Sequence, residues 1–126
     1  MILRPLLCLP LLLFVGVLHA LEKLPYDEAA FARTQTEGKV SVLLFHTAWC
    51  PVCIMQERSL ESLKGEKAYE QVRVFVADFL RERALREKHN VGSFATLVVF
   101  RGNEEKARVT GESRVEQIRS LLGRAL

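Results

Sequence analysis

Short apolar runs alternate with amphipathic stretches along most of the chain after residue 25. Three runs rich in β-branched and aromatic residues are typical of strands buried on both faces: 40–45, 72–77 and 96–100. Four other stretches are predicted to be helical: 26–37, 54–64, 81–89 and a C-terminal segment with an apolar stripe at Val115, Ile118, Leu121 and Leu122. Gly102-Asn103 indicates a two-residue hairpin turn, so 106–110 is predicted to pair back as an antiparallel strand.

The order of these elements predicts an α/β fold with three layers. A central mixed sheet of about four strands, parallel apart from an antiparallel C-terminal hairpin, is expected to carry helices on both faces. Leu21–Pro25 are expected to form an exposed leader, too short for a further strand. Because no repeat, low-complexity tract or linker interrupts the pattern, residues 21–126 are predicted to form one domain.

The first 20 residues have the layout of a secretory signal peptide. Arg4 precedes thirteen apolar residues, Leu6–Leu18, and the small residue Ala20 follows. The run is shorter than the roughly 20 residues that span a membrane, and Pro10 interrupts it. We therefore expect cleavage near Ala20 and a periplasmic or otherwise extracytoplasmic location, with an uncleaved membrane anchor as the alternative.

Composition narrows the classes of function. With 18 basic and 15 acidic residues among 126, the chain has a small net charge and no strong electrostatic field. Nucleic acid is therefore not an expected partner. Three cysteines are too few for a disulfide-dense scaffold. Cleavage would remove Cys8 and leave one pair, Cys50 and Cys53.

This pair lies in Trp49-Cys50-Pro51-Val52-Cys53, where a buried strand is predicted to turn into a helix. The two-residue spacing lets the sulfurs meet across one helical turn. The first sulfur then lies at a helix N-terminus, where free N–H groups stabilise a thiolate and lower its pKa. We expect Cys50 to be the accessible, attacking thiol and Cys53 to resolve the mixed disulfide.

Together with the later segment Phe94-Ala95-Thr96-Leu97-Val98-Val99-Phe100, the motif resembles the thioredoxin superfamily. The resemblance implies catalysis by Cys50 and Cys53, and substrate contacts at Trp49, Pro51, Val52, Phe94, Ala95 and Thr96. Ala77-Asp78 and 107–111 before a helix are similar to the C-terminal periplasmic domain of the membrane thiol:disulfide interchange reductase. That similarity implies protein thiols and disulfides as partners and a membrane-embedded electron donor.

Two positions depart from the family pattern. Leu44 stands where the family has a buried acid six residues before the first cysteine, and Ala95 stands where it has a cis-proline. A cis bond before alanine costs about 2.5–4 kcal/mol, so the Phe94–Ala95 peptide is predicted to be trans. Because both positions normally assist turnover or substrate binding in the family, the departures imply less efficient catalysis.

Three functions are consistent with the sequence. The favoured one is an exported thiol:disulfide oxidoreductase, which acts as a monomer without a cofactor or resident metal. Pro51-Val52 offers no polar group to the thiolate, which favours a reductant. The alternatives are a catalytically weak binding module with this fold, and a carrier in which two thiolates form half of a soft-metal site.

Overall fold

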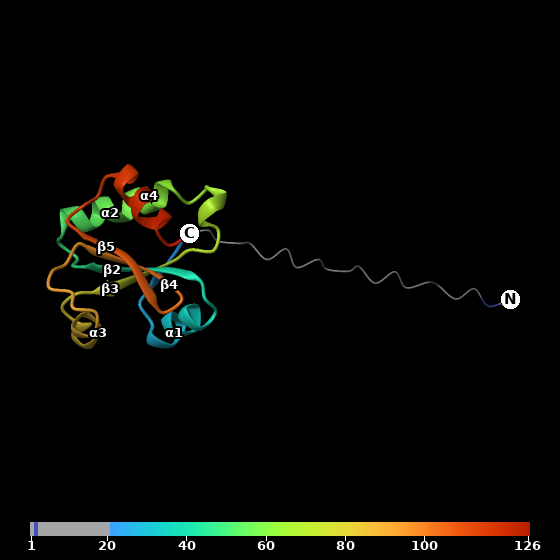
Figure 1. The fold of residues 1–126 in the computed structure, drawn as a ribbon, viewed down its shortest axis with the longest axis horizontal. Helices are drawn as coiled ribbons and strands as arrows, with labels where there is room; N and C mark the ends of the chain where they lie inside the picture. The colour runs from blue at the N-terminus through green and yellow to red at the C-terminus, as the bar shows by residue number, and fades with distance from the viewer. Residues whose placement is uncertain (1, 3–20) are drawn as a thin grey trace.

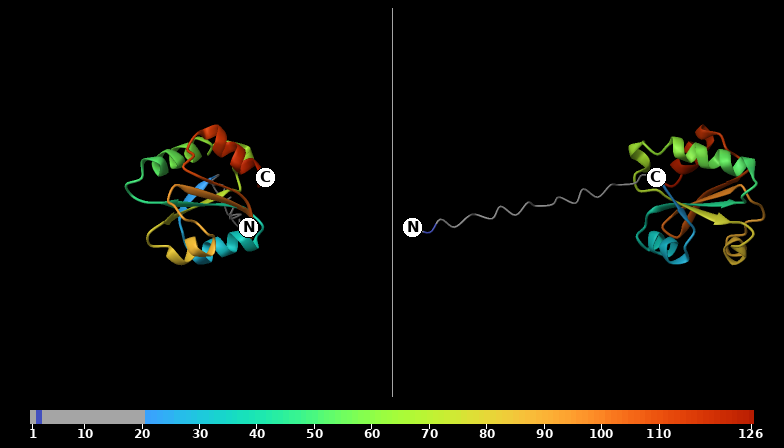
Figure 2. Two further views of the ribbon diagram at one scale, coloured as in Figure 1. Left: turned by 60° about the vertical axis from the view of Figure 1, so that its left-hand side comes forward. Right: turned by 180° about the vertical axis from the view of Figure 1, so that it is seen from behind.

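The computed structural model describes Ile2 and residues 21–126. The predicted signal peptide and its cleavage point therefore lie, apart from Ile2, outside the described residues. A five-stranded sheet forms the middle layer, with α2 and α4 on one face and α1 and α3 on the other (Figures 1 and 2). In chain order the elements are β1 (Glu22–Pro25), α1 (Glu28–Thr36), β2 (Val40–His46), α2 (Pro51–Ser62), η1 (Lys67–Tyr69), β3 (Arg73–Asp78), α3 (Arg83–Lys88), β4 (Thr96–Arg101), β5 (Glu104–Thr110) and α4 (Val115–Gly123).

The strand order is β1-β3-β2-β4-β5, which makes β2 the central strand. β1, β3 and β2 run parallel, whereas β4 and β5 are antiparallel to their neighbours. The C-terminal ends of β2 and β3 are in register, since His46 pairs with Asp78. This mixed three-layer sheet confirms the predicted fold class.

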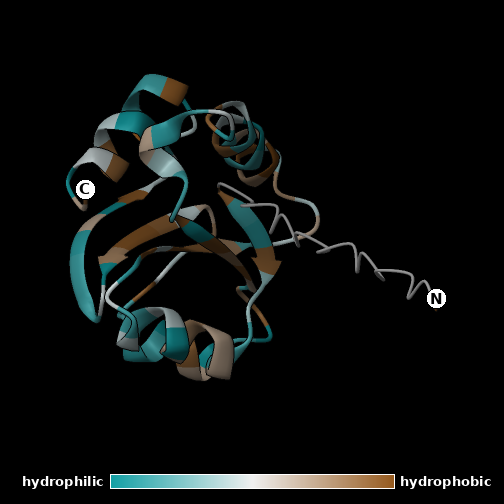
Figure 3. Ribbon diagram, turned by 90° about the vertical axis from the view of Figure 1, so that its right-hand side faces the viewer, coloured by the Kyte–Doolittle hydropathy of each residue, from teal (hydrophilic) through white to brown (hydrophobic). Residues whose placement is uncertain are grey.

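Alternate residues of β2 face two separate cores. Val42 and Leu44 pack beneath α2 and α4, and Leu43 and Phe45 pack against α1 and α3. All four side chains are buried, because helices cover both faces of the sheet. Figure 3 shows the apolar strands between the two helical layers.

The prediction of an exposed leader at residues 21–25 was wrong. Glu22–Pro25 form the edge strand β1, which pairs with β3 in the register Leu24↔Phe75, and Leu21 is buried. Pro25 is tolerated because it ends an edge strand, where one side of the backbone needs no partner. The sheet thus has five strands rather than about four.

The remaining elements lie where the pattern predicted them, with shifted ends. The turn at Gly102-Asn103 is present, with Gly102 at φ +58° as such a turn requires, but β5 already begins at Glu104. The short 3₁₀ helix η1, which buries Tyr69, was not predicted. No helix among the described residues is long and apolar enough to span a membrane.

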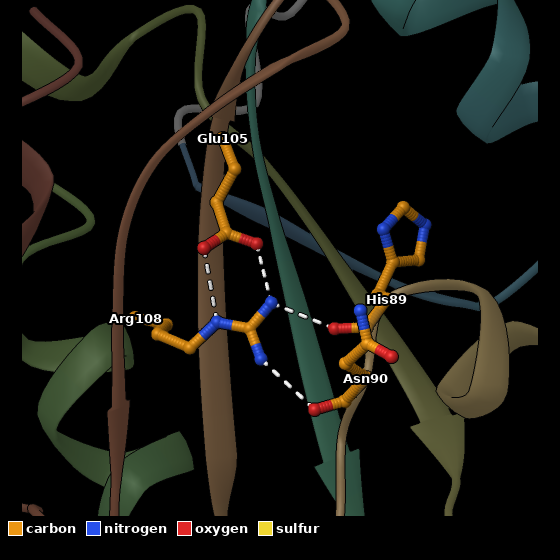
Figure 4. Close-up of polar contacts among 4 residues, drawn as sticks. All are labelled: His89, Asn90, Glu105 and Arg108. Atoms are coloured by element: carbon orange, nitrogen blue, oxygen red, sulfur yellow. Dashed lines mark hydrogen bonds and ion pairs between the residues drawn. The ribbon is translucent and has the colours of Figure 1, made fainter.

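An arginine holds the end of α3 against the sheet (Figure 4). Arg108 on β5 donates through Nε to the carboxylate of Glu105 at 2.9 Å, and its Nη groups donate to the carbonyls of His89 at 2.7 Å and Asn90 at 3.2 Å. These carbonyls follow the last turn of α3, where no further helical turn supplies donors. The guanidinium therefore satisfies carbonyls that the helix leaves free.

Candidate functional site

The cysteine motif lies at the edge of the sheet where β2 and β3 end. The 47–50 segment leads from β2 into α2, and Phe79 N–H, just after β3, donates to the His46 carbonyl at 2.9 Å. The chain returns to this edge at residues 93–95, where Ala95 N–H donates to the carbonyl of Phe45 at 2.7 Å. Three connections thus meet around the cysteines.

Cys50 is the N-cap of α2. Its backbone is extended (φ −95°, ψ 107°), and its Sγ accepts a hydrogen bond from the Cys53 N–H at 3.1 Å. Pro51 occupies the first helical position, where its missing N–H costs nothing. The sulfur of Cys50 therefore lies among the free donors of the helix N-terminus, as the sequence predicted, and this position favours a thiolate once the pair is reduced.

Cys50 and Cys53 form a disulfide, with their Cα atoms 5.3 Å apart. Their exposed fractions are 2% and 1%, so in this oxidised state Cys50 is no more accessible than Cys53, contrary to the expectation. Val52, Phe94 and Ala95 pack against the pair and cover it. The chemical difference between the two sulfurs comes from the cap position, since both are equally covered.

Ala95 lies against the disulfide in an unusual conformation. The described residues contain no cis peptide bond, so the Phe94–Ala95 peptide is trans, as predicted. Ala95 has φ +58°, in the left-handed region that residues with a Cβ rarely occupy. Its N–H is bonded to Phe45, and its carbonyl accepts from the Gly111 N–H at 2.9 Å. Both backbone groups of Ala95 are therefore used inside the protein.

The other predicted substrate-contact residues divide into a rim and a support. Trp49 is 67% exposed and packs edge-to-face on Phe94, with ring centroids 5.3 Å apart. Pro51 is also exposed, and Val52 is half-buried. Thr96 is buried, and its hydroxyl bonds to the Ser93 carbonyl and the Thr110 hydroxyl, both at 2.8 Å. Trp49, Pro51 and Phe94 can meet a partner, whereas the hydroxyl of Thr96 fixes the loop.

Leu44, at the position of the family's buried acid, is fully buried on β2. It pairs with Val76 on β3 and Leu97 on β4, and it belongs to the core beneath α2 and α4. An apolar side chain suits this environment because an unpaired carboxylate there would lose its solvation. Leu44 therefore brings no ionisable group to this position of the central strand.

One polar residue of the site was missed by the sequence reasoning. Gln56, one turn after Cys53 on α2, is fully buried, and its Nε2 donates to the carbonyls of Ala95 at 2.9 Å and Glu112 at 3.0 Å. A signal was present, because Cys53, Gln56 and Leu60 follow the helical spacing of a buried stripe. A glutamine on such a stripe indicates a polar contact inside the protein.

A pocket beside β1 carries ionisable side chains. His46, Val76 and Glu57 line a pocket of about 260 Å³, and Lys23 Nζ lies 3.7 Å from Glu57 Oε1. Within the part of the chain that the structure describes, no three His, Cys, Asp or Glu side chains gather as metal ligands would.

Comparison with known proteins agrees with this geometry. The family model for thioredoxin matches residues 22–124. Among solved structures, Trxlp from Edwardsiella tarda EIB202 is 32% identical, covers 80% of this chain and 98% of its own, and superposes with a TM-score of 0.76. A mutant thioredoxin from Halobacterium salinarum NRC-1 is 22% identical (85% and 93% covered, TM-score 0.71). Thioredoxin O2 from Arabidopsis thaliana, in the oxidised state, is 24% identical (82% and 93% covered, TM-score 0.67).

No curated protein sequence gives a match. The family match spans nearly all of residues 21–126. Cys50 caps α2 and forms a disulfide with Cys53. The chain therefore belongs to the thioredoxin family, and Cys50 and Cys53 are the redox centre of a thiol–disulfide oxidoreductase.

Proposed function

We propose that this protein is an exported thiol:disulfide oxidoreductase that works as a monomer and reduces disulfides in partner proteins. The observation that carries the proposal is the Cys50 sulfur at the cap of α2, next to an exposed apolar rim. The cap supplies the nucleophile, and the rim supplies a surface on which a protein segment can dock.

The reaction proceeds in two exchanges. The Cys50 thiolate attacks one sulfur of the partner's disulfide, which breaks that S–S bond and releases the other partner sulfur as a thiolate that takes up a proton. The Cys53 thiol then loses its proton, attacks Cys50 and displaces the partner's remaining sulfur. Two electrons pass to the partner, and the product is the Cys50–Cys53 disulfide seen in the structure.

The rim favours an apolar partner segment. Trp49, Ile54 and Met55 have exposed fractions of 67%, 44% and 52%, and all three lie within five residues of Cys50. Phe94 completes the rim through its contact with Trp49. Because exposed apolar side chains of this size are uncommon as a group, they indicate a docking surface for a protein rather than for a small thiol.

The reducing direction is supported by the chemistry of the motif. Pro51 and Val52 bring no polar side chain to the thiolate, so the two residues between the cysteines add nothing to the stabilisation that the helix terminus gives the reduced pair. A reductant of this kind must be re-reduced. The similarity to the periplasmic domain of the membrane thiol:disulfide interchange reductase supports a membrane-embedded donor. Equilibration with glutathione buffers tests the direction, and an equilibrium as oxidising as that of a disulfide-forming enzyme would refute it.

Trapping tests the exchange itself. Cys53→Ser should accumulate mixed disulfides with partner proteins, visible on non-reducing gels, whereas Cys50→Ser should not, because it lacks the attacking sulfur. If neither variant traps a partner and the unaltered protein fails to reduce insulin disulfides, the pair is a structural crosslink.

N-terminal sequencing of the exported product tests cleavage of the predicted signal peptide. A start near Leu21 supports the signal peptide, and an intact Met1 on a membrane-bound product supports an anchor.

A second candidate, a binding module with slow catalysis, is favoured by two observations. Leu44 offers no proton acceptor below the pair, and the backbone of Ala95 is bonded internally. Insulin reduction with dithiothreitol separates the two functions, because a binding module would trap partners without multiple turnover.

A further inference from the structure

Gln56 is an unusual residue for its position. Its side chain is fully buried on the face of α2 that also carries Cys53 and Leu60, where an apolar residue would be expected. Burying an amide costs free energy unless its donors and acceptors are bonded. The Nε2 group is bonded twice, to the Ala95 and Glu112 carbonyls, whereas Oε1 has no protein partner. The protein thus keeps a costly group that ties the helix to two loops.

One of these bonds holds the strained residue beside the cysteines. Ala95 is at φ +58°, a conformation that persists only when surrounding contacts determine it. The Ala95 N–H donates to the Phe45 carbonyl, and the Ala95 carbonyl accepts from both the Gly111 N–H and Gln56 Nε2. The bonds to Phe45 and Gly111 come from the sheet and its edge, but the bond from Gln56 comes from the helix that carries both sulfurs.

We propose that Gln56 is a positioning residue that fixes the 93–95 loop relative to the cysteine pair and so shapes the docking site for protein disulfides. Gln56 does not touch the rim; it acts through Ala95, whose neighbour Phe94 packs on Trp49 and on Phe79, with ring centroids 5.3 and 6.2 Å apart. Without this bond, the Phe94–Trp49 rim can shift while the sulfurs stay in place. This inference rests on the proposed function.

The test compares a large and a small disulfide. Gln56→Met keeps the length and most of the volume but has no donor. For insulin, kcat/KM should fall about tenfold, the factor that corresponds to losing roughly one or two net hydrogen bonds, with most of the change in KM. The rate with 5,5′-dithiobis(2-nitrobenzoate), which needs no docking surface, should change less than twofold. Because Trp49 is the only tryptophan, its fluorescence anisotropy reports the rim directly and should fall in the variant.

Ser59 offers a matched control. It lies on the same helix, and its hydroxyl donates to the Ser113 carbonyl in the loop that also carries Glu112. Ser59→Ala therefore removes a bond between the same two segments without touching Ala95. It should leave the insulin KM, the small-disulfide rate and the Trp49 anisotropy unchanged.

Several outcomes overturn the proposal. Equal loss with both substrates would place the effect on the sulfur chemistry or on folding, and unchanged kinetics would show that the bond is irrelevant. If Gln56→Met does not fold, hydrogen exchange in the unaltered protein decides. The Gln56 side-chain NH₂ should exchange far more slowly than those of the exposed Gln71 and Gln117, and equal rates would refute the contact. Failure of the proposed function looks different, because the unaltered protein itself would not reduce insulin.

Discussion

The backbone of Ala95 gives a quantitative prediction, because two substitutions at this position should act in opposite ways. Proline has no N–H, so Ala95→Pro leaves the buried Phe45 carbonyl without its donor, which costs about 1–3 kcal/mol. The ring also requires φ near −65°, whereas Ala95 has φ +58°, so the loop must rearrange. We expect a total loss of about 3 kcal/mol or more in the free energy of unfolding.

Glycine should be almost neutral at the same position. It relieves the left-handed strain of about 1–2 kcal/mol. It also loses the burial of one methyl group, about 0.8 kcal/mol, and makes the unfolded chain more flexible, by about 0.4–1 kcal/mol. These contributions nearly cancel, so Ala95→Gly should stay within about 1 kcal/mol of the unaltered protein.

Urea and thermal unfolding of the oxidised proteins, followed by circular dichroism, measure both changes. For a domain of this size 1 kcal/mol corresponds to roughly 4–8 °C, so the melting temperature should fall by more than about 10 °C in Ala95→Pro. Ala95→Gly should melt close to the unaltered protein. A proline variant as stable as the glycine variant would show that the loop does not hold Ala95 in this conformation, and the reasoning would be wrong.

Three further predictions concern the core, the pH response and the arginine contact. Leu44→Ala should lower the free energy of unfolding by about 2–5 kcal/mol, and Leu44→Asp should lower it further because the carboxyl is buried. Leu44→Asp should nevertheless speed the decay of the mixed disulfide, because the carboxylate supplies a proton acceptor. A folded Leu44→Asp variant with an unchanged decay rate would show that the acid is not needed. Burial, followed by the positive charge of Lys88, lowers the pKa of His89 in the folded protein. The contribution of neutral His89 to the free energy of unfolding should therefore be fully present above the unfolded-state pKa of about 6.5 and decline as the pH falls below it. His89→Phe should reduce the loss in urea midpoint between pH 7.5 and 5.5. An unchanged loss would show that other groups cause the pH dependence. Arg108→Lys keeps the charge but loses the planar set of donors to Glu105 and the two carbonyls. We expect it to lower the free energy of unfolding, measured in urea, by about 1 kcal/mol. An unchanged free energy would show that water replaces these bonds.

The sequence predicted those elements whose stability is local or evident from burial. β2 and β4 are covered on both faces, so their residues form apolar runs that are easy to recognise. β1 has only four residues with alternating exposure, and its stability comes from pairing with β3, whose residue Arg73 is 51 positions from Glu22. No pattern within residues 21–25 contains that partner, so the strand was missed.

The same distinction applies to the site. The cysteines were found because their spacing and their place after a strand are local features. The partners of Gln56 are 39 and 56 residues away, and the left-handed backbone of Ala95 is determined by bonds to Phe45, Gly111 and Gln56. Such contacts depend on the assembled fold, so the sequence alone does not reveal them.

β1 pairs with a strand that follows it in the chain by about 50 residues, and this separation affects how the chain assembles. Synthesis proceeds from the N-terminus, so β1 emerges before β3 but cannot pair until β3, about 50 residues later, is also free of the ribosome. Contacts between distant residues slow folding because a long loop must close before they form. We expect β1 to remain unpaired until the chain is exposed past Asp78, the end of β3. Until then β3 has an open edge: β2 and β3 can already pair with each other, and this side of the sheet is completed only when β1 adds to β3.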